Sequence, residues 1–238
     1  IEAALNRYLS PGVARSVLAA PGHQRLQGRA VRGSVLFCDI VDFTRLSRGL
    51  PPEQVVDLVN DYFGAFAMAG SVCGGTVDKF IGDSVMILFG VPEPDRRHAL
   101  NAVVCGQAIV RLAQAINLRR RALGLPTVVF RLALNSGQMQ AGNLGSLERM
   151  EFTVLGDSVN LAARLCARSP VDRLVISADT LGEPGVAAEV EVEPVGPLQL
   201  KGYDDPVSAY AVRDVGQRTR TRVEACLAAV NDPAVAPV

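Results

Sequence analysis

The segment GSVLFCDIV, residues 33–41, is the most apolar run of strand length in the sequence. Such a run is typical of a central strand that is covered on both faces. Asp39 lies inside it, and burying a carboxylate costs on the order of several kcal/mol unless a cation or hydrogen bonds compensate the charge. The segment therefore predicts a central strand, and Asp39 is either a cap for the helix that follows or part of a functional site.

Helical and strand patterns follow this segment. Residues 52–72 place apolar side chains at helical spacing. Residues 76–80 and 84–90 are strand patterns separated only by IGD, which predicts a tight hairpin. Residues 95–122 predict a long helix with Asp95 as its N-cap.

The rest of the chain continues in the same way. The patterns predict strands at 127–137, 138–144, 152–156, 173–177, 190–196 and 206–212, a helix capped by Asp157, and a helix from residue 216. Strands and helices alternate early and hairpins dominate the middle, so the sequence predicts an α/β fold with a mixed sheet.

Composition excludes several classes of protein. The 238 residues include 24 basic and 24 acidic side chains, and this balance argues against binding to a nucleic acid polymer. No apolar run approaches the roughly 18 residues that span a bilayer, and no signal-peptide pattern is visible. The five cysteines are scattered without a CxxC pair, which predicts reduced, mostly buried thiols in a cytosolic compartment.

The N-terminal region has its own character. Residues 1–20 have a helical pattern interrupted at Ser10-Pro11, and residues 21–32 are polar and predict a linker. Because the chain begins with Ile1 rather than Met, we expect it to be a piece of a longer protein.

Carboxylates and cations supply the candidate site residues. Asp83 lies at the tip of the predicted hairpin, where it is either an ordinary turn residue or, with Asp39, one of two hard oxygen ligands of the kind that Mg²⁺ prefers. Asn160 and Arg164 lie one helical turn apart, which suits a ribose and a phosphate but also fits a solvated helix face.

The remaining candidates are weaker. Lys79 and Lys201 are lone lysines of a kind that is usually solvated, whereas Arg131 lies within an apolar strand and must find a partner or extend to solvent. We expect His23 and His98 to be surface residues, so the sequence predicts no histidine-based catalytic centre.

Five motifs together resemble the class III nucleotidyl cyclase catalytic domain. They are LFCDIVDFT (36–44), GGTVDKFIGDSVMILFG (74–90), RLALNSGQMQAGNLGS (131–146), EFTVLGDSVNLAARL (151–165) and LQLKG (198–202). The resemblance implies a ferredoxin-like mixed sheet flanked by helices, acting as a head-to-tail homodimer with active sites at the interface. It implies three parts: an N-terminal helical segment and linker (1–32), the catalytic domain (33–213) and a C-terminal tail (214–238).

The resemblance also implies metal and catalytic roles. Asp39 and Asp83 match the carboxylates that bind two Mg²⁺ (or Mn²⁺) per active site, with Ile40 beside them as a third metal contact. Asn160 and Arg164 match the pair that orients the ribose and stabilises the transition state.

Other residues match contacts to the nucleotide. By resemblance, Arg131 and Lys201 hold the triphosphate, and the Phe43-Thr44 turn cradles phosphates with its backbone. Asp42 replaces a glycine that is frequent in the family, and it could crowd that turn. Lys79 matches the lysine that reads adenine in adenylyl cyclases.

Thr153 lies where many adenylyl cyclases have Asp and a largely bacterial subgroup has Thr. A hydroxyl both donates and accepts hydrogen bonds, so it reads the base less strictly than a carboxylate. The resemblance implies attack of the ribose 3′ oxygen of ATP on the α-phosphorus, giving 3′,5′-cyclic AMP and pyrophosphate, with Asp39 or water as the general base.

Alternatives remain at this point. They are a guanylate cyclase, which Lys79 disfavours, and a catalytically silent nucleotide-binding regulatory domain, which the intact motifs disfavour. A diguanylate cyclase is excluded because its GGDEF-type signature is absent. The resemblance further implies an upstream sensor domain, a cytoplasmic catalytic domain in a protein that could be membrane-anchored, and bicarbonate as a candidate effector.

Overall fold

The computed structural model describes residues 28–145 and 150–232 of the chain. The predictions for residues 1–27 and for the last six residues lie outside this part. The strands are β1 (Arg29–Ile40), β2 (Gly75–Ile81), β3 (Ser84–Phe89), β4 (Phe130–Gly145), β5 (Met150–Leu155), β6 (Leu174–Ser177), β7 (Val190–Leu198) and β8 (Val207–Val215). The helices are α3 (Phe43–Arg48), α4 (Pro52–Val72), α5 (His98–Ala122), α6 (Asp157–Arg168), α7 (Ala178–Leu181) and α8 (Gln217–Val230).

All eight strands form one mixed sheet. Its order is β2-β3-β1-β4-β6-β8-β7, and β5 pairs with β4. The first four strands in this order are antiparallel, whereas β6 lies parallel to β4. Along the chain, the core strands and helices follow the order β1-α4-β2-β3-α5-β4. This is the ferredoxin-like arrangement that the family resemblance implies.

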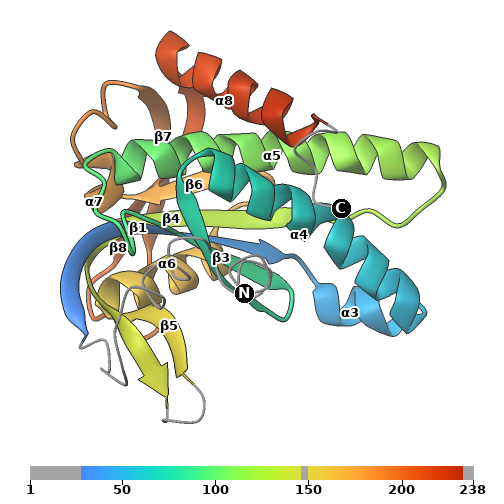
Figure 1. The fold of residues 1–238 in the computed structure, drawn as a ribbon, viewed down its shortest axis with the longest axis horizontal. Coiled ribbons are helices and arrows are strands. Elements are labelled where there is room, and N and C mark those ends of the chain that lie inside the picture. The colour runs from blue at the N-terminus through green and yellow to red at the C-terminus, as the bar shows by residue number, and fades with distance from the viewer. Residues whose placement is uncertain (1–27, 146–149, 233–238) are drawn as a thin grey trace, which may run out of the picture.

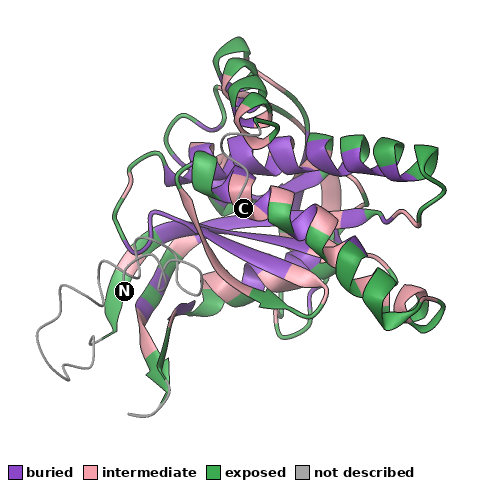
Figure 2. Cartoon of the chain, turned by 45° about the vertical axis from the view of Figure 1, so that its right-hand side comes forward, coloured by how far each residue is buried: buried purple, intermediate pink, exposed green. Residues whose placement is uncertain are grey.

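Helices cover both faces of the sheet (Figure 1). One face packs against α4 and α5, with α8 packed on these two helices, and the other face packs against α6. Alternate residues of β1 serve the two cores: Leu36 and Ile40 lie in the first, and Val35 and Phe37 in the second. Figure 2 shows the buried strands between the helical layers. The prediction of a central strand covered on both faces is confirmed.

Helix α5 is the only described element that is long and apolar enough to cross a membrane by length and composition, and 67% of its most apolar window is buried. Its contacts with the sheet, α4 and α8 identify it as a core helix.

Several predicted boundaries are wrong. Strand β1 begins at Arg29, inside the predicted linker 21–32, and continues the ladder with β4. Helix α5 begins at His98 rather than at Asp95, although the Asp95 carboxylate still accepts from the Arg97 backbone nitrogen at 2.9 Å. Helix α6 has Asp157 as its first residue instead of its cap.

The two strands predicted at 127–137 and 138–144 are one strand, β4. In the sequence, Gly137 in the middle of β4 resembles the end of a strand. In the structure it pairs with Gly33, and a Cβ at Gly137 would lie 2.4 Å from the Ser158 hydroxyl oxygen. This glycine is therefore required by close packing of α6 against an uninterrupted strand.

All five cysteines are free and buried, as predicted. The sulfurs of Cys73, at the end of α4, and of Cys226, in α8, lie 3.5 Å apart. Burial raises the pKa of Cys38 and of Cys166 well above the usual thiol value.

Candidate active site

The sheet brings Asp39 and Asp83 together. Strand β1 pairs Asp39 with Ser84 on one side and with Arg131 on the other. Because Ser84 begins β3, the Gly82-Asp83 turn lies beside the end of β1. The backbone nitrogen of Ile40 donates to the Asp83 carbonyl at 3.1 Å. Two acidic residues and an arginine therefore meet at one end of neighbouring strands.

A cavity of about 620 Å³ opens at this point. Its lining includes Asp39, Ile40, Asp42, Phe43, Thr44, Arg45, Arg48, Asp83 and Arg131. All the residues predicted to hold metal are in this lining, together with three of the four predicted phosphate contacts. The residues predicted to read the base and ribose do not line it.

The surroundings of Asp39 favour a positive charge beside its carboxylate. Burial raises the pKa of Asp39, and the negative charge of Asp83 raises it further, although a short hydrogen bond from the Ser84 hydroxyl and the charge of Arg131 act in the opposite direction. A bound cation would compensate the cost of burying the Asp39 charge and would reduce its repulsion from Asp83.

The donor set fits a hard cation that also binds substrate. Among the described residues, no group of three or more His, Cys, Asp or Glu side chains gathers as a metal site. A cation in the cavity would thus be held by the carboxylates of Asp39 and Asp83 with backbone or phosphate oxygens. Mg²⁺ is commonly bound in this way, through one or two carboxylates and substrate phosphates.

Asp42 adopts the left-handed conformation that its position requires. Its φ is 55°, it precedes α3, and Asp tolerates this region better than most residues. The Asp42 carboxylate lies 3.5 Å from the Arg45 guanidinium. The substitution for glycine is accommodated within the turn, and Phe43 and Thr44 reach the cavity.

Lys79 and Thr153 lie together in a second cluster. The Lys79 ammonium is 2.6 Å from Glu151 and 3.4 Å from Asp78, and the Thr153 hydroxyl donates to Asp78 at 2.8 Å. Burial alone would lower the pKa of Lys79, but Glu151 and Asp78 outweigh it and raise the pKa. The predicted base-reading residues are thus joined by Asp78, which the sequence analysis did not single out.

Arg164 and the Lys201-Gly202 turn form a third group. The Arg164 guanidinium stacks 5.3 Å from the centre of the Tyr203 ring, and the Tyr203 hydroxyl donates to the Asp157 carboxylate at 2.7 Å. Burial and Asp157 raise the pKa of Tyr203 to about 12. The contact between Tyr203 and Asp157 had no signal in the sequence because it joins two distant segments. Asn160 is exposed on α6, and Lys201 is exposed in its turn.

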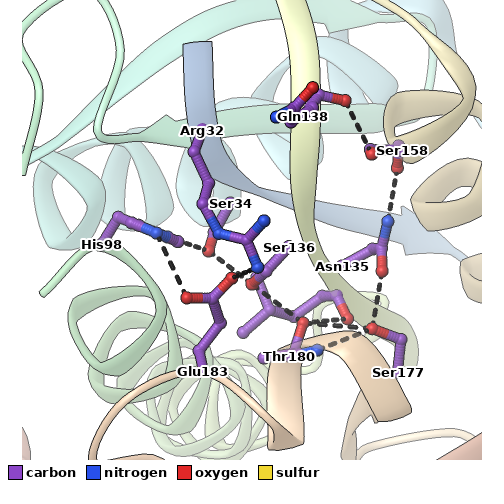
Figure 3. A network of polar contacts seen from close by, with 11 residues as sticks. Arg32, Ser34, His98, Asn135, Ser136, Gln138, Ser158, Ser177, Thr180 and Glu183 are labelled. Carbon is purple, nitrogen blue, oxygen red and sulfur yellow. Dashed lines mark hydrogen bonds and ion pairs between the residues drawn. The ribbon is translucent and has the colours of Figure 1, made fainter. Parts of the chain in front are cut away.

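A buried polar network ends at the first turn of α6 (Figure 3). Asn135 of β4 donates to the Ser158 carbonyl at 2.8 Å and accepts from the Ser177 hydroxyl at 2.6 Å. The Ser158 hydroxyl donates to the Gln138 carbonyl at 2.8 Å. Side chains of the sheet therefore tie down the start of the helix that carries the predicted catalytic pair.

His98 lies at the opposite end of this network, where Figure 3 places it beside Ser34 and Glu183. Its Nδ1 is 2.7 Å from the Ser34 hydroxyl oxygen, and its Nε2 is 3.6 Å from the Glu183 carboxylate. The prediction of a surface histidine is wrong, because α5 begins at this residue and packs its first turn against the sheet, leaving His98 5% exposed. Burial lowers the pKa of His98, and the Glu183 charge opposes that shift.

Comparison with known proteins places this site in a family. The model of the adenylate and guanylate cyclase catalytic domain matches residues 29–214. Adenylate cyclase 1 of Rhizobium meliloti (strain 1021) is 34% identical over 192 residues, which are 79% of this chain and 28% of that protein. The chain spans about a third of the length of the curated relatives that it matches.

Solved structures agree with the family model. The adenylyl cyclase CyaB from P. aeruginosa is 33% identical with a TM-score of 0.75, over 80% of this chain and 100% of that one. The guanylyl cyclase Cya2 is 34% identical with a TM-score of 0.76, over 81% of this chain and 96% of that one. The chain therefore belongs to the family of adenylate and guanylate cyclase catalytic domains.

Proposed function

We propose that this chain is the catalytic domain of an adenylate cyclase, which converts ATP to 3′,5′-cyclic AMP and pyrophosphate. The observation that carries the proposal is the meeting of Asp39, Asp83 and Arg131 in one cavity of a cyclase fold. Two carboxylates and a guanidinium suit a metal-bound triphosphate. Asn160 and Arg164 supply the remaining polar groups of the family pattern.

The separation of the site residues supports a homodimer. Asp39, Asp83 and Arg131 line the cavity, whereas Lys79, Thr153 and the α6 pair lie outside its lining. In our proposal, two chains associate head to tail, so that the cavity of one protomer faces the base-reading cluster of the other. A symmetric pair would then form two equivalent sites.

Each group has a role in the proposed reaction. The ribose 3′ oxygen attacks the α-phosphorus, a new P–O bond forms, and the bond to the β-phosphate bridge breaks to release pyrophosphate. The proton of the 3′-hydroxyl passes to Asp39 or to water. Bound Mg²⁺ or Mn²⁺, two ions per site in our proposal, would supply a lowered pKa for the attacking hydroxyl and neutralise the leaving phosphates.

The side chains of the protein position and stabilise the reactants. Asp39 and Asp83 hold the cations, Arg131 and Lys201 contact the triphosphate, and Asn160 orients the ribose. Arg164 neutralises the charge that develops at phosphorus, and its stacking on Tyr203 holds the guanidinium in one orientation. Positioning and electrostatics supply most of the catalysis in such transfers.

A guanylate cyclase is the second candidate. The guanylyl cyclase Cya2 and the adenylyl cyclase CyaB have nearly the same sequence identity and TM-score to this chain. Lys79 favours ATP, because an ammonium donates to N1 of adenine but meets an N–H group at N1 of guanine. Competition between ATP and GTP for turnover separates the two candidates.

The decisive experiment is an assay of the purified chain with ATP or GTP and Mg²⁺ or Mn²⁺, with cyclic nucleotide measured by chromatography. We expect cyclic AMP from the wild type and a loss of roughly 10²- to 10³-fold in kcat for Arg164→Ala. Arg168→Ala, one turn further along α6 and exposed, is the matched control. No cyclic product from either nucleotide would reject the proposal in favour of a silent nucleotide-binding domain.

The larger protein is also a matter of proposal. We propose that the catalytic unit runs from β1 to β8, with α8 packed on α4 and α5, and that the residues before Arg29 connect it to an upstream sensor. The catalytic unit would lie in the cytoplasm, whether or not the whole protein is anchored in a membrane. Bicarbonate as an effector stays a prediction from the sequence.

A further inference from the structure

Asp78 occupies an irregular position in β2. Val77 pairs with Ile87 and Lys79 pairs with Met86, so Asp78 is the extra residue of a β-bulge. Consecutive side chains of a regular strand point to opposite faces, and a bulge changes the direction of one of them. As a result the side chains of the consecutive residues Asp78 and Lys79 lie together, and the Lys79 ammonium is 3.4 Å from the Asp78 carboxylate.

The Asp78 carboxylate is buried and engages Thr153. The Asp78 side chain is 1% exposed, and its Oδ2 accepts from the Thr153 hydroxyl at 2.8 Å. An ionised carboxylate only accepts hydrogen bonds, and a hydroxyl has a single proton. The Thr153 proton is therefore committed to Asp78, and the Thr153 oxygen offers only its lone pairs to another partner.

We propose that Asp78 determines nucleotide selectivity by holding the Thr153 hydroxyl as an obligate hydrogen-bond acceptor towards the base. Adenine carries an amino group at position 6, which donates to such an oxygen. Guanine carries a carbonyl at that position, which would meet another acceptor. A Thr hydroxyl free to rotate would donate to the carbonyl, so the restraint by Asp78 gives Thr153 the selectivity of a carboxylate.

Lys79 completes the reading of the base. Its ammonium is held by Glu151 and Asp78, and it presents only donors, which match N1 of adenine. Donor and acceptor are thus fixed by the same buried carboxylate. This inference rests on the proposed function, because it assigns the substrate of the same site.

The test is the selectivity of Asp78→Leu, which keeps a branched side chain of similar shape and removes both acceptor oxygens. We expect the ATP-to-GTP ratio of kcat/KM to fall by about tenfold or more, because the Thr153 hydroxyl loses its acceptor and becomes free to donate to guanine. Thr153→Val should lower the same ratio and Thr153→Ser should preserve it. The double variant Asp78→Leu/Thr153→Val should lose no more selectivity than Thr153→Val alone.

Asp57→Asn, which removes a negative charge from an exposed position of α4, is the control, and it should leave the ratio unaltered. An unchanged ratio in folded Asp78→Leu, or additive losses in the double variant, would overturn the proposal. If Asp78→Leu does not fold, a Thr153→Val ratio equal to that of the wild type overturns it.

The proposed function can fail separately. If neither nucleotide is cyclised, the dissociation constants of ATP and GTP replace kcat/KM as the readout. A wild-type preference for ATP that is lost in Asp78→Leu would still support the role of Asp78, while equal affinities for the two nucleotides in both proteins would reject it.

Discussion

The backbone nitrogen of Ile40 lies 3.1 Å from the carbonyl oxygen of Asp83, and this hydrogen bond fixes the β2–β3 turn against the end of β1. Two acidic residues from separate motifs are therefore held side by side by the main chain. Because the arrangement does not depend on their side chains, either carboxylate can be exchanged while the other keeps its place.

Asp83→Asn tests the cation site on this basis. We expect an unchanged melting temperature and a concentration of Mg²⁺ for half-maximal activity that rises roughly tenfold or more, because one anionic oxygen ligand is lost. A Mg²⁺ titration of activity beside a thermal melt checks both. Asp57→Asn, an exposed carboxylate on α4, should respond like the wild type.

Mixing two inactive variants tests the interface. Asp39→Ala and Arg164→Ala should each abolish most activity as homodimers. Their mixture should regain it, because a mixed dimer contains one site with neither substitution. Mixed dimers that form, as shown by differently tagged chains, yet remain inactive would exclude the shared site.

Gly202→Ala tests the position of Arg164. Gly202 has φ 79°, and an added Cβ would lie 2.7 Å from Nη1 of Arg164. Gly185 has φ 82° with open space around it, so Gly185→Ala reproduces the backbone strain alone. Both should destabilise by a similar amount, about 1 kcal/mol. Only Gly202→Ala should lower kcat, and equal kcat values would show that the Arg164 position is unimportant.

Asn135→Leu tests the support of α6. The substitution removes the Asn135 partner of the Ser158 carbonyl, at a cost of about 1–3 kcal/mol, whereas the Ser177 hydroxyl can still donate to the Thr180 hydroxyl at 3.2 Å. We expect a lower free energy of unfolding in urea and, under conditions where the variant stays folded, a reduced kcat. A folded variant with the kcat of the wild type would show that the hydrogen bonds of Asn135 do not contribute to catalysis.

His98 gives the stability a dependence on pH. Its pKa is lowered in the folded state from the usual 6.5, so below that value the unfolded chain binds a proton that the folded chain refuses. The contribution to stability is complete above pH 6.5 and is lost as the pH falls through the folded-state pKa. His98→Gln should flatten the fall between pH 7 and pH 5 in urea unfolding, by at most about 1.4 kcal/mol per pH unit.

The sequence predicted the elements whose pattern is local. The apolar run of β1, the tight hairpin and the spacing of α4 each depend on neighbouring residues, and the structure confirms them. Gly137 misled the prediction of β4, because its reason for being glycine is the approach of Ser158 from another part of the chain. His98 was misplaced for a similar reason, since its burial depends on tertiary packing.

The candidate site likewise contains residues that local motifs predict and residues that only tertiary contacts place. The residues expected in the cavity, such as Asp39 and Arg131, lie within recognisable motifs, and the structure places them in its lining. Asp78 lies beside Lys79 in the sequence, yet its role depends on a bulge and on a contact with β5. Tyr203 likewise gains its position from Asp157 on a distant helix.

The inaccessible thiols make the protein a convenient subject for labelling. Burial of every native cysteine keeps these side chains from solvent, and the raised pKa values keep Cys38 and Cys166 protonated and unreactive. A single cysteine introduced on the surface would therefore carry a fluorophore or spin label without removal of the native residues. Pairs of such labels would measure the distance between protomers directly in solution.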